Sequence, residues 1–600
     1  AVAHLQEAGP VAVPFVIEAL NRSGISPENR SLLVRNLGRL DHAAVPPLLA
    51  VLDSGDPALM ADTATALGQI GDSRAIPFLI YPAASADSPS GLGQAARMAI
   101  SQLTGKPYGM VSRTAVQAIA DAAWRFHRHQ VDFPGDPVAV WVWNKEQNVP
   151  ASQLMRRADA ESYFGLRLAD QAIKLEPKNL DAQAVYWSLS LQKAVNRFGF
   201  NGFPAQDPAT SDAAKKAGPT VLTEVLRKAL ADGKDDLAAV AASILGEVTH
   251  PSELTHGGRP HPLVDALVSP GPRAQFAAAR ALVNMAPRMP FPGSSRVVPV
   301  LARFVIAQSL PRAMVIDSNS ARGSQIIGSL RALGYETVME TRGDLGFRAA
   351  TETADVELVL ISYALDRGAA WDLLDTLTNL KSDARTNDLP VFVYGPLNLE
   401  VNRLNLPLNF PGVRFLVQPM TPEILEKLIG GRPSRLSGSD RATYAQQATA
   451  LLAQIAQQPQ GPYESDLKAA EPALMIALSQ PTTSLAASMA LGDIPDSKAQ
   501  RSLADVVLDP SRPIDLRRNS ASQLARSIKH YGPLVSADQE VRLAAASRSA
   551  ADPQFRSELE NALTALRSWS HSNHKMAMGV HVPTAGPVVP GAGGSARNPR

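Results

Sequence analysis

The chain contains no cysteine among its 600 residues. Without cysteine there is no disulfide, no thiolate nucleophile, and no cysteine-ligated zinc, iron–sulfur cluster or covalently attached haem. Aromatic residues are scarce, at 5% of the sequence, and the opposite charges nearly cancel to give a net charge of +2 at pH 7. A balanced charge provides no electrostatic footprint for nucleic acid or for an anionic membrane.

Long hydrophobic runs are also lacking. A membrane-spanning helix needs about 18 or more consecutive apolar residues, and the most apolar stretch, residues 297–310, is interrupted by Pro299 and Arg303. We therefore expect no transmembrane segment. The sequence begins at Ala1 rather than at methionine, which indicates either a removed signal peptide or a missing N-terminal part. On this ground we slightly favour an exported or envelope location in a bacterium over the cytoplasm.

An internal repeat occupies the first part of the chain. The sequence Ala-Val-Pro-Phe at residues 12–15 returns as Ala-Val-Pro-Pro at 44–47 and as Ala-Ile-Pro-Phe at 75–78. The period is about 31 residues, within the range of helical solenoids. Each proline falls near the first turn of a helix, where its missing N–H costs little. These residues resemble the short HEAT repeats of bacterial proteins, and the resemblance implies stacked helix pairs.

The same pattern predicts how the rest of the chain is divided. Helix pairs with a Leu-Gly ending recur at 245–246 and 491–492, so we expect HEAT-like repeats in residues 1–110, 216–310 and 442–569. Residues 431–441 have the composition of a flexible linker. Residues 570–600 are rich in glycine, proline, alanine and valine without a period, which predicts a disordered or extended tail.

Residues 111–215 form a different segment. The run Ala-Ile-Lys-Leu-Glu-Pro-Lys-Asn at 172–179 resembles the second helix and exit of a tetratricopeptide repeat, which implies one more α-hairpin in the stack. Three of the six tryptophans lie within twenty residues, at Trp124, Trp141 and Trp143, together with Phe126. Such residues dominate interface hot spots, so they are a candidate interaction surface. The alternative, which we favour, is a local core that packs a hairpin at 138–143 against helices.

Residues 311–430 alternate short apolar runs with helical segments. The apolar runs are residues 313–316, 336–340, 357–361, 391–394 and 413–417. This alternation predicts a flavodoxin-like α/β domain, a five-stranded parallel sheet with helices on both faces. The expected fold class is therefore mainly α, a HEAT- and tetratricopeptide-like α-solenoid with this domain at its centre.

In this order the residues resemble a bacterial response-regulator receiver domain. The resemblance implies four functional positions: an acidic pair after strand one that holds Mg²⁺, a phosphoacceptor aspartate after strand three, a serine or threonine after strand four, and a lysine before the proline that follows strand five. The corresponding positions here are Asp317 with Ser318, then Ser362, Gly395, and Gln418 with Pro419.

These substitutions remove the chemistry that the resemblance would imply. Hard cations need several oxygen ligands, and one carboxylate without an acceptor aspartate cannot form the site for Mg²⁺ and an acyl phosphate. The resemblance therefore predicts a pseudo-receiver, which keeps the fold and has lost phosphorylation. The alternative for Asp317 is a turn or helix-capping residue.

The sequence contains no P-loop, nucleophile elbow, metalloprotease motif or EF-hand loop. The pair Asp235-Asp236 is expected on an exposed helix surface. Three histidines at 250, 256 and 261 have the chemistry of zinc or copper ligands, yet no nearby carboxylate supports them and we expect solvated loop residues. We accordingly expect no enzyme, no cofactor and no metal site.

The favoured hypothesis is a non-catalytic scaffold that binds protein partners, including copies of itself, through its helical repeats. A second hypothesis is a phosphorylation-independent signalling regulator, in which the pseudo-receiver binds a ligand or a kinase. A third is a structural component of a bacterial envelope or surface assembly.

Overall fold

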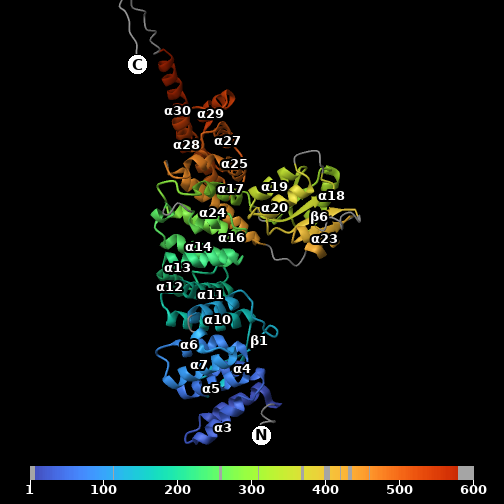
Figure 1. Cartoon of the computed structure of the whole chain (residues 1–600). Helices are drawn as coiled ribbons and strands as arrows, with labels where there is room; N and C mark the ends of the chain where they lie inside the picture. Colours follow the sequence, from blue (N-terminus) through green and yellow to red (C-terminus); the bar gives the residue numbers. More distant parts are fainter. Residues whose placement is uncertain are drawn as a thin grey trace, which may run out of the picture. The chain divides into compact units, whose positions relative to one another are not determined.

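The computed structural model describes residues 7–111, 114–255, 260–307, 310–365, 371–396, 406–418, 420–429, 435–458 and 460–578. The chain divides into two compact units, residues 1–444 and 445–600. The first contains a helical array and an α/β domain, and the second contains helices alone (Figure 1).

The array of the first unit consists of helix pairs, each of which packs on the next (Figure 1). Its helices are α2 (Ala12–Leu20), α3 (Pro27–Leu37), α4 (Val45–Val51), α5 (Pro57–Ile70), α6 (Ile76–Ala84), α7 (Ser90–Thr104), α8 (Tyr108–Val111), α9 (Ala115–His127), α10 (Arg157–Leu175), α11 (Leu180–Phe198), α12 (Pro208–Ala217), α13 (Pro219–Ala231), α14 (Asp235–Val248), α15 (Pro262–Ala266), α16 (Pro272–Asn284) and α17 (Val297–Val305).

The repeated Ala-Val-Pro sequence is a helix start. The Asp41 side chain accepts a hydrogen bond from the Ala43 amide at 3.0 Å, and Asp72 accepts one from the Arg74 amide at 2.9 Å. A short 3₁₀ turn follows each aspartate, and α4 and α6 then begin with a proline in the first turn. The carboxylates satisfy amides that have no intrahelical partner, and proline tolerates the position because it has no amide to satisfy.

The glycine of the Leu-Gly ending allows second helices to approach closely. A Cβ atom at Gly68 in α5 would lie 2.8 Å from the Cα of Ala99 in α7, and Gly246 in α14 faces Ala281 in α16 in the same way. Any larger residue at these two positions would push the helices apart, because a packed interior does not accommodate such an overlap. The motif therefore sets the spacing between neighbouring repeats.

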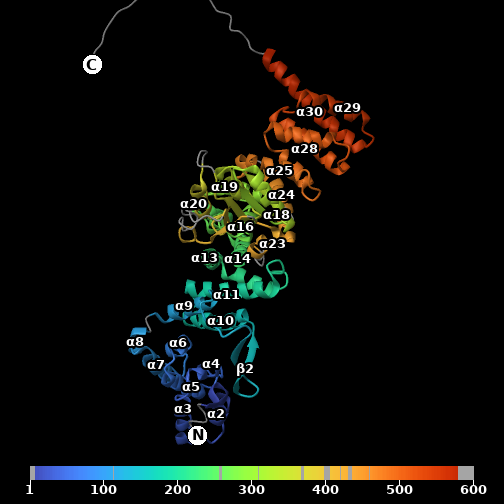
Figure 2. The same ribbon diagram turned by 90° about the vertical axis from the view of Figure 1, so that its right-hand side faces the viewer.

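A two-stranded antiparallel hairpin lies between α9 and α10 in the chain. Its strands, β1 (Val138–Asn144) and β2 (Val149–Met155), pair from Val138 opposite Met155 to Asn144 opposite Val149. Val138 and Val140 pack with Ala160 of α10, and both strands contact α4 (Figure 2). The Asn21 side chain donates a hydrogen bond to the Asn148 carbonyl at 2.9 Å, which fixes the tip beside α2.

The α/β domain contains a five-stranded parallel sheet. Along the sheet the strands lie in the order β4-β3-β5-β6-β7, the flavodoxin-like order 2-1-3-4-5. Its elements are β3 (Arg312–Ile316), α18 (Ser320–Ala332), β4 (Glu336–Glu340), α19 (Gly343–Glu352), β5 (Val356–Ser362), α20 (Leu373–Ser382), β6 (Val391–Gly395), α22 (Leu406–Asn409), β7 (Val413–Val417) and α23 (Pro422–Ile429). The predicted five parallel strands are confirmed.

Helices cover both faces of this sheet. On one face, strand residues such as Met314 and Ile361 pack with residues of α19 and α20; on the other, Val315 and Leu360 pack with α18 and α23. Both neighbours along each strand are therefore buried, which explains why the central strands are continuous apolar runs rather than alternating ones.

The α/β domain is inserted between the two helices of one repeat. Helix α17 starts like the other first helices, after a 3₁₀ turn and with Pro299 near its start. The chain returns beside α16 and α17 only after the sheet, at residues 438–444, which begin α24 (Gly438–Ala456). The Tyr444 ring stacks on Phe276 of α16 at 4.3 Å between centroids and meets the edge of Phe304 of α17 at 5.7 Å.

A carboxylate of the sheet also holds the returning chain. Glu357, near the start of β5, accepts a hydrogen bond from the Arg435 amide at 3.0 Å and forms an ion pair with Arg441. Arg441 is almost fully buried, at 2% exposure, so its charge requires this partner. At the first turn of α24, Asp440 accepts hydrogen bonds from Arg273 at 3.0 Å and from Asn201 at 2.8 Å.

The second unit contains three further helix pairs. They are α25 (Glu471–Ala477) with α26 (Ser484–Leu491), α27 (Ser497–Leu508) with α28 (Ile514–Tyr531), and α29 (Ala537–Ser549) with α30 (Pro553–Met578). Helix α30 continues to Met578, so the expectation of a tail from residue 570 was wrong for its first residues. Residues 579–600 lie outside the described part.

Replacing Tyr444 tests whether the aromatic stack closes the interrupted repeat. Tyr444 is 4% exposed, and removing a buried aromatic ring costs about 3–5 kcal/mol. We expect Tyr444→Ala to lower the unfolding free energy of the first unit by this amount in chemical denaturation. Tyr444→Phe is the matched control, because the hydroxyl has no hydrogen-bond partner among the described residues and its loss should change little. Equal stability of Tyr444→Ala and the parent chain would contradict the stack's role.

Candidate functional site

The carboxyl edge of the parallel sheet collects the residues that the receiver resemblance singled out. Asp317 follows β3, Ser362 ends β5, Gly395 ends β6 and Gln418 follows β7. Parallel strands end at the same edge, and the Gln418 amide donates a hydrogen bond to the Gly395 carbonyl at 2.9 Å. Pro419 lies outside the described residues.

Asp317 is fully buried, and side chains of its own domain hold its carboxylate. It accepts hydrogen bonds from Arg322 Nε at 2.7 Å and Nη2 at 2.5 Å, and from the Tyr394 hydroxyl at 2.6 Å. The Asn319 amide donates a further bond at 2.9 Å. Arg322 Nη2 also donates to Ser362 Oγ at 2.9 Å. A buried carboxylate needs a counter-charge, and the Arg322 guanidinium supplies it.

Local structure places Arg322 at this edge. The Asn319 side chain caps α18 by accepting a hydrogen bond from the Arg322 amide at 3.0 Å, so Arg322 lies in the first turn, next to the end of β3. The hydrogen bond to Asp317 raises the pKa of Arg322. Burial, and then the hydrogen bond to Asp317, raise the pKa of Tyr394. Both donors therefore keep their protons at neutral pH.

Arg322 already provides the positive charge at the carboxyl edge of the sheet. The receiver resemblance implies an acidic pair after strand one that holds Mg²⁺ and an acceptor aspartate after strand three. Here Arg322 Nη2 bonds both Asp317 and Ser362, which occupy these positions. Ser318 donates its hydroxyl to the Ala364 carbonyl at 3.2 Å. Within the described residues, no group of three or more metal-binding side chains is found.

Sequence reasoning missed Arg322 and Tyr394. The available signals were an arginine in the first turn of the helix after β3 and a tyrosine at the carboxyl end of β6. Neither signal identifies its partner without the strand order, because β3 and β6 are separated in the sheet by β5.

Removing the arginine tests the pairing. Arg322→Gln should lower the unfolding free energy by about 3–5 kcal/mol, because breaking a buried ion pair leaves one charge uncompensated. The double variant Asp317→Asn with Arg322→Gln should recover much of that loss, since no buried charge remains. Chemical denaturation of both variants gives the comparison. If the single and double variants were equally stable, the account of Arg322 as the internal counter-ion would be wrong.

The aromatic residues of the second segment divide into two groups. Trp124 and Phe126 are 3% and 8% exposed, and Phe126 stacks on Phe164 with centroids 5.7 Å apart. Their burial agrees with the local core that we favoured in the sequence analysis, because they belong to the packing between helices. Trp141 and Trp143 on β1 are half-buried and stay candidates for an interaction surface.

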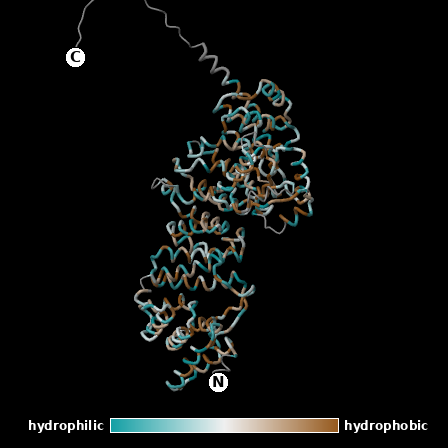
Figure 3. The backbone as a smooth tube through the Cα atoms, turned by 45° about the vertical axis from the view of Figure 1, so that its right-hand side comes forward, coloured by the Kyte–Doolittle hydropathy of each residue, from teal (hydrophilic) through white to brown (hydrophobic). Residues whose placement is uncertain are grey.

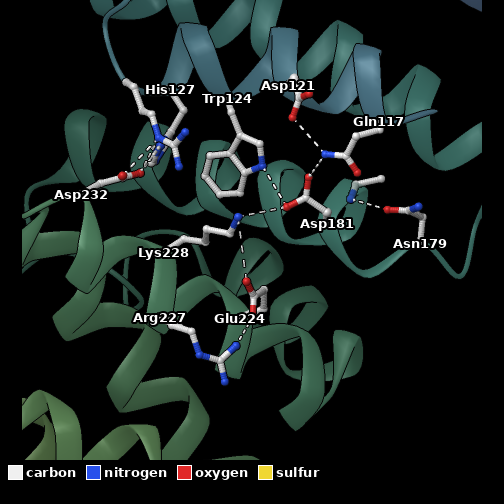
Figure 4. A network of polar contacts seen from close by, with 12 residues as sticks. Gln117, Asp121, Trp124, His127, Asn179, Asp181, Glu224, Arg227, Lys228 and Asp232 are labelled. Carbon is white, nitrogen blue, oxygen red and sulfur yellow. Dashed lines mark hydrogen bonds and ion pairs between the residues drawn. The ribbon is translucent and has the colours of Figure 1, made fainter. Parts of the chain in front are cut away.

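Trp124 belongs to a polar network that joins α9, α11 and α13 (Figure 4). Asp181 at the start of α11 is its centre. It accepts hydrogen bonds from Trp124 Nε1 at 3.2 Å and Gln117 Nε2 at 3.0 Å, and pairs with Lys228 at 3.3 Å. Lys228 also lies over the Trp124 ring, 5.2 Å from its centroid, a favourable cation–π position. The network joins α9, α11 and α13 to one another.

His127 lies beside this network and is 2% exposed. Its ring meets the edge of Trp124 at 5.2 Å. Burial, and then the positive charges of Lys234, His129 and Arg128, lower the pKa of His127 to about 3, although Asp232 lies 4.0 Å from Nδ1. The folded chain therefore keeps this imidazole neutral under conditions in which the unfolded chain protonates it.

This difference predicts acid sensitivity. Between pH 6.5 and 3 the unfolded state binds a proton at His127 that the folded state does not, so stability falls as the pH is lowered through this range. Between pH 7 and 5 the loss is about 2 kcal/mol, and His127→Phe should lack that part of it. Denaturation at both pH values, followed by tryptophan fluorescence, measures the difference. Identical pH dependence in both chains would contradict the prediction.

A pocket of about 910 Å³ lies along the turns of the array, lined by Lys234, Asp235 and Arg273 among others. Asp235 is half-buried and accepts hydrogen bonds from the amides of Arg273 at 3.1 Å and Ala274 at 2.8 Å. From the start of α14 it thus caps α16, and its expected exposure on a helix surface was wrong. Arg273 in turn donates to Asp236 at 2.8 Å. The charged side chains that line the pocket therefore hold α14 and α16 together.

Comparison with known proteins supports the repeat architecture. Residues 13–101 match the family model of HEAT repeats, whereas no curated protein sequence matches the chain. Two similar solved structures are those of Kap121p bound to Nup53p and of Kap121p bound to Ste12p, at 11% and 12% identity. They cover 96% and 95% of this chain and 74% of that chain, each with a TM-score of 0.19. At that score the similarity adds nothing to what the family match shows.

The chain is a mainly helical HEAT-repeat protein with a central five-stranded parallel sheet. Hydrophobic and hydrophilic residues are mixed along its helices (Figure 3). In the part of the chain that the structure describes, no helix combines the length and apolarity needed to cross a membrane.

Proposed function

We propose that this chain is a non-catalytic scaffold that binds other proteins, with a receiver-like domain that docks rather than receives a phosphoryl group. The observation that carries the proposal is the combination of a HEAT array with a buried Asp317 already neutralised by Arg322. Stacked helix pairs present extended surfaces for partners. The ion pair of Arg322 with Asp317 supports a domain that acts by docking and carries out no phosphoryl chemistry. The resemblances to HEAT repeats and to a receiver domain favour a bacterial protein.

Native mass spectrometry of the full chain tests the scaffold. We expect complexes, with co-purified partners or with further copies of the chain, at working concentrations. Cross-linking of the same sample should then join the repeats to the partner. Only isolated monomer, in preparations that retain the folded array, would contradict the proposal.

Acetyl phosphate with Mg²⁺ tests the receiver-like domain separately. The mass of the chain should not change, because Ser362 hydrogen-bonds Arg322 and no acceptor aspartate is at that position. Asp317→Asn serves as the matched sample, since any labelling of the parent chain that this variant loses would identify Asp317 as an acceptor. Such labelling would overturn the proposal of a phosphorylation-independent domain.

A second candidate function is a signalling regulator, favoured by the position of the insertion. The sheet separates the two helices of one repeat, and Glu357 holds both Arg435 and Arg441 where the chain returns. A ligand that moved the α/β domain would therefore act directly on α24. Binding would appear as a thermal shift with altered amide exchange in residues 312–430 and 438–444, and Glu357→Gln should uncouple the second region from the first.

A further inference from the structure

The outer edge of β2 has no backbone partner within the chain. Among the described residues, the backbone hydrogen bonds of β2 go to β1 alone. In a two-stranded sheet, each strand directs half of its amides and carbonyls away from its neighbour. These groups form a row of alternating donors and acceptors, which is the pattern that an extended chain complements.

Toward its C-terminal end, β2 is more exposed than most of the β1 residues opposite it. Across the sheet, Val140 is buried and its partner Gln153 is exposed, and half-buried Trp141 faces exposed Ser152. Ser152, Gln153 and Leu154 are exposed in succession, and Leu154 has 73% of its surface exposed. Consecutive strand residues point to opposite faces, so this stretch has exposed side chains on both faces of the hairpin.

The edge also lacks the features that block strand pairing. Natural edge strands usually carry charges, prolines or bulges that prevent association. Residues 151–155 read Ala-Ser-Gln-Leu-Met, with no charge and no proline, and the register with β1 is continuous without a bulge. The only proline of β2, Pro150, lies next to the tip. An unprotected edge of this kind is expected where a strand is meant to be added.

We propose that residues 151–155 of β2 bind an extended segment of a partner protein, which adds a third strand to the hairpin. Backbone hydrogen bonds to the edge supply the attachment. The partner's side chains alternate: apolar ones lie on the face of Leu154, with Trp141 on the same face of β1, and polar ones lie on the face of Gln153. The ligand class is thus an amphipathic, uncharged β-strand rather than a helix or a folded surface.

The hairpin is suited to hold such a strand. Strand β1 packs on α10 through Val138 and Val140, and the tip of the hairpin is attached to α2 through Asn21. A two-stranded hairpin alone is marginally stable, so anchoring at both ends gives the edge a fixed geometry before a partner arrives. A partner strand can then pair with β2 at no cost for ordering β1 and β2.

The proposal is a specific form of the protein-binding function proposed above. The two can fail separately, because native mass spectrometry reports on any complex of the whole chain and the experiment below reports on one strand. A scaffold that binds through its helices alone would pass the first test and fail the second.

A displayed library of eight-residue peptides tests the edge on the full chain. Its members carry Val, Ile, Leu, Phe or Thr at even positions and Ser, Thr or Gln at odd ones. Ser152→Lys with Leu154→Lys places two charges on the exposed face of the edge, where folding should be unaffected. The matched control is Met289→Lys, at a residue that is 69% exposed elsewhere in the first unit. Circular dichroism verifies that both variants fold.

We expect peptides enriched on the parent chain and on Met289→Lys that bind the edge variant at least tenfold more weakly. Such peptides should slow amide exchange in residues 151–155. Methylating those backbone nitrogens of the peptides that face β2 should also weaken peptide binding at least tenfold, because methylation removes hydrogen bonds and leaves side chains unchanged. No enrichment, equal binding to the edge variant, or protection of other residues would overturn the proposal. Concentration-dependent dimers that protect residues 151–155 would assign the edge to a second copy and would also overturn it.

Discussion

The packing of Tyr444, stacked on Phe276 and edge-on to Phe304, is the contact on which the interrupted part of the first unit depends. A repeat protein is stabilised mainly by contacts between sequence neighbours, and an insertion inside one repeat separates two helices that must pack. The aromatic cluster restores that contact after the chain has formed a complete α/β domain. Asp440 and Arg441 anchor residues 438–444 to α16 and to the sheet, so the returning chain packs on the helices that precede the sheet.

The need to neutralise a buried charge also explains the contacts of Asp317 at the carboxyl edge of the sheet. A fully buried carboxylate in the Asp317 position needs either a bound cation or an internal one. In this chain the internal cation is Arg322, and Tyr394 completes the set of donors. The carboxylate is therefore neutralised within the domain and needs no bound cation.

Much of the fold could be predicted from local sequence. The Ala-Val-Pro and Leu-Gly motifs mark helix starts and close helix contacts, which depend on a few adjacent residues, and the apolar runs of the sheet follow from burial on both faces. The pairing of α17 with α24 could not be predicted, because the partners are separated by the whole α/β domain. Arg322 was missed since its role depends on strand order. The polar network around Trp124 could not be predicted, because its partners Asp181 and Lys228 lie on other helices.

Native-state hydrogen exchange of the full chain, measured at increasing denaturant, tests the interrupted repeat most directly. The account predicts that the amides of α16, of α17 and of residues 438–444 share one opening free energy, because they form a single packed unit. The strands of the sheet should open with a different free energy. If residues 438–444 exchanged freely while α16 and α17 remained protected, the claim that α24 completes the repeat would be contradicted.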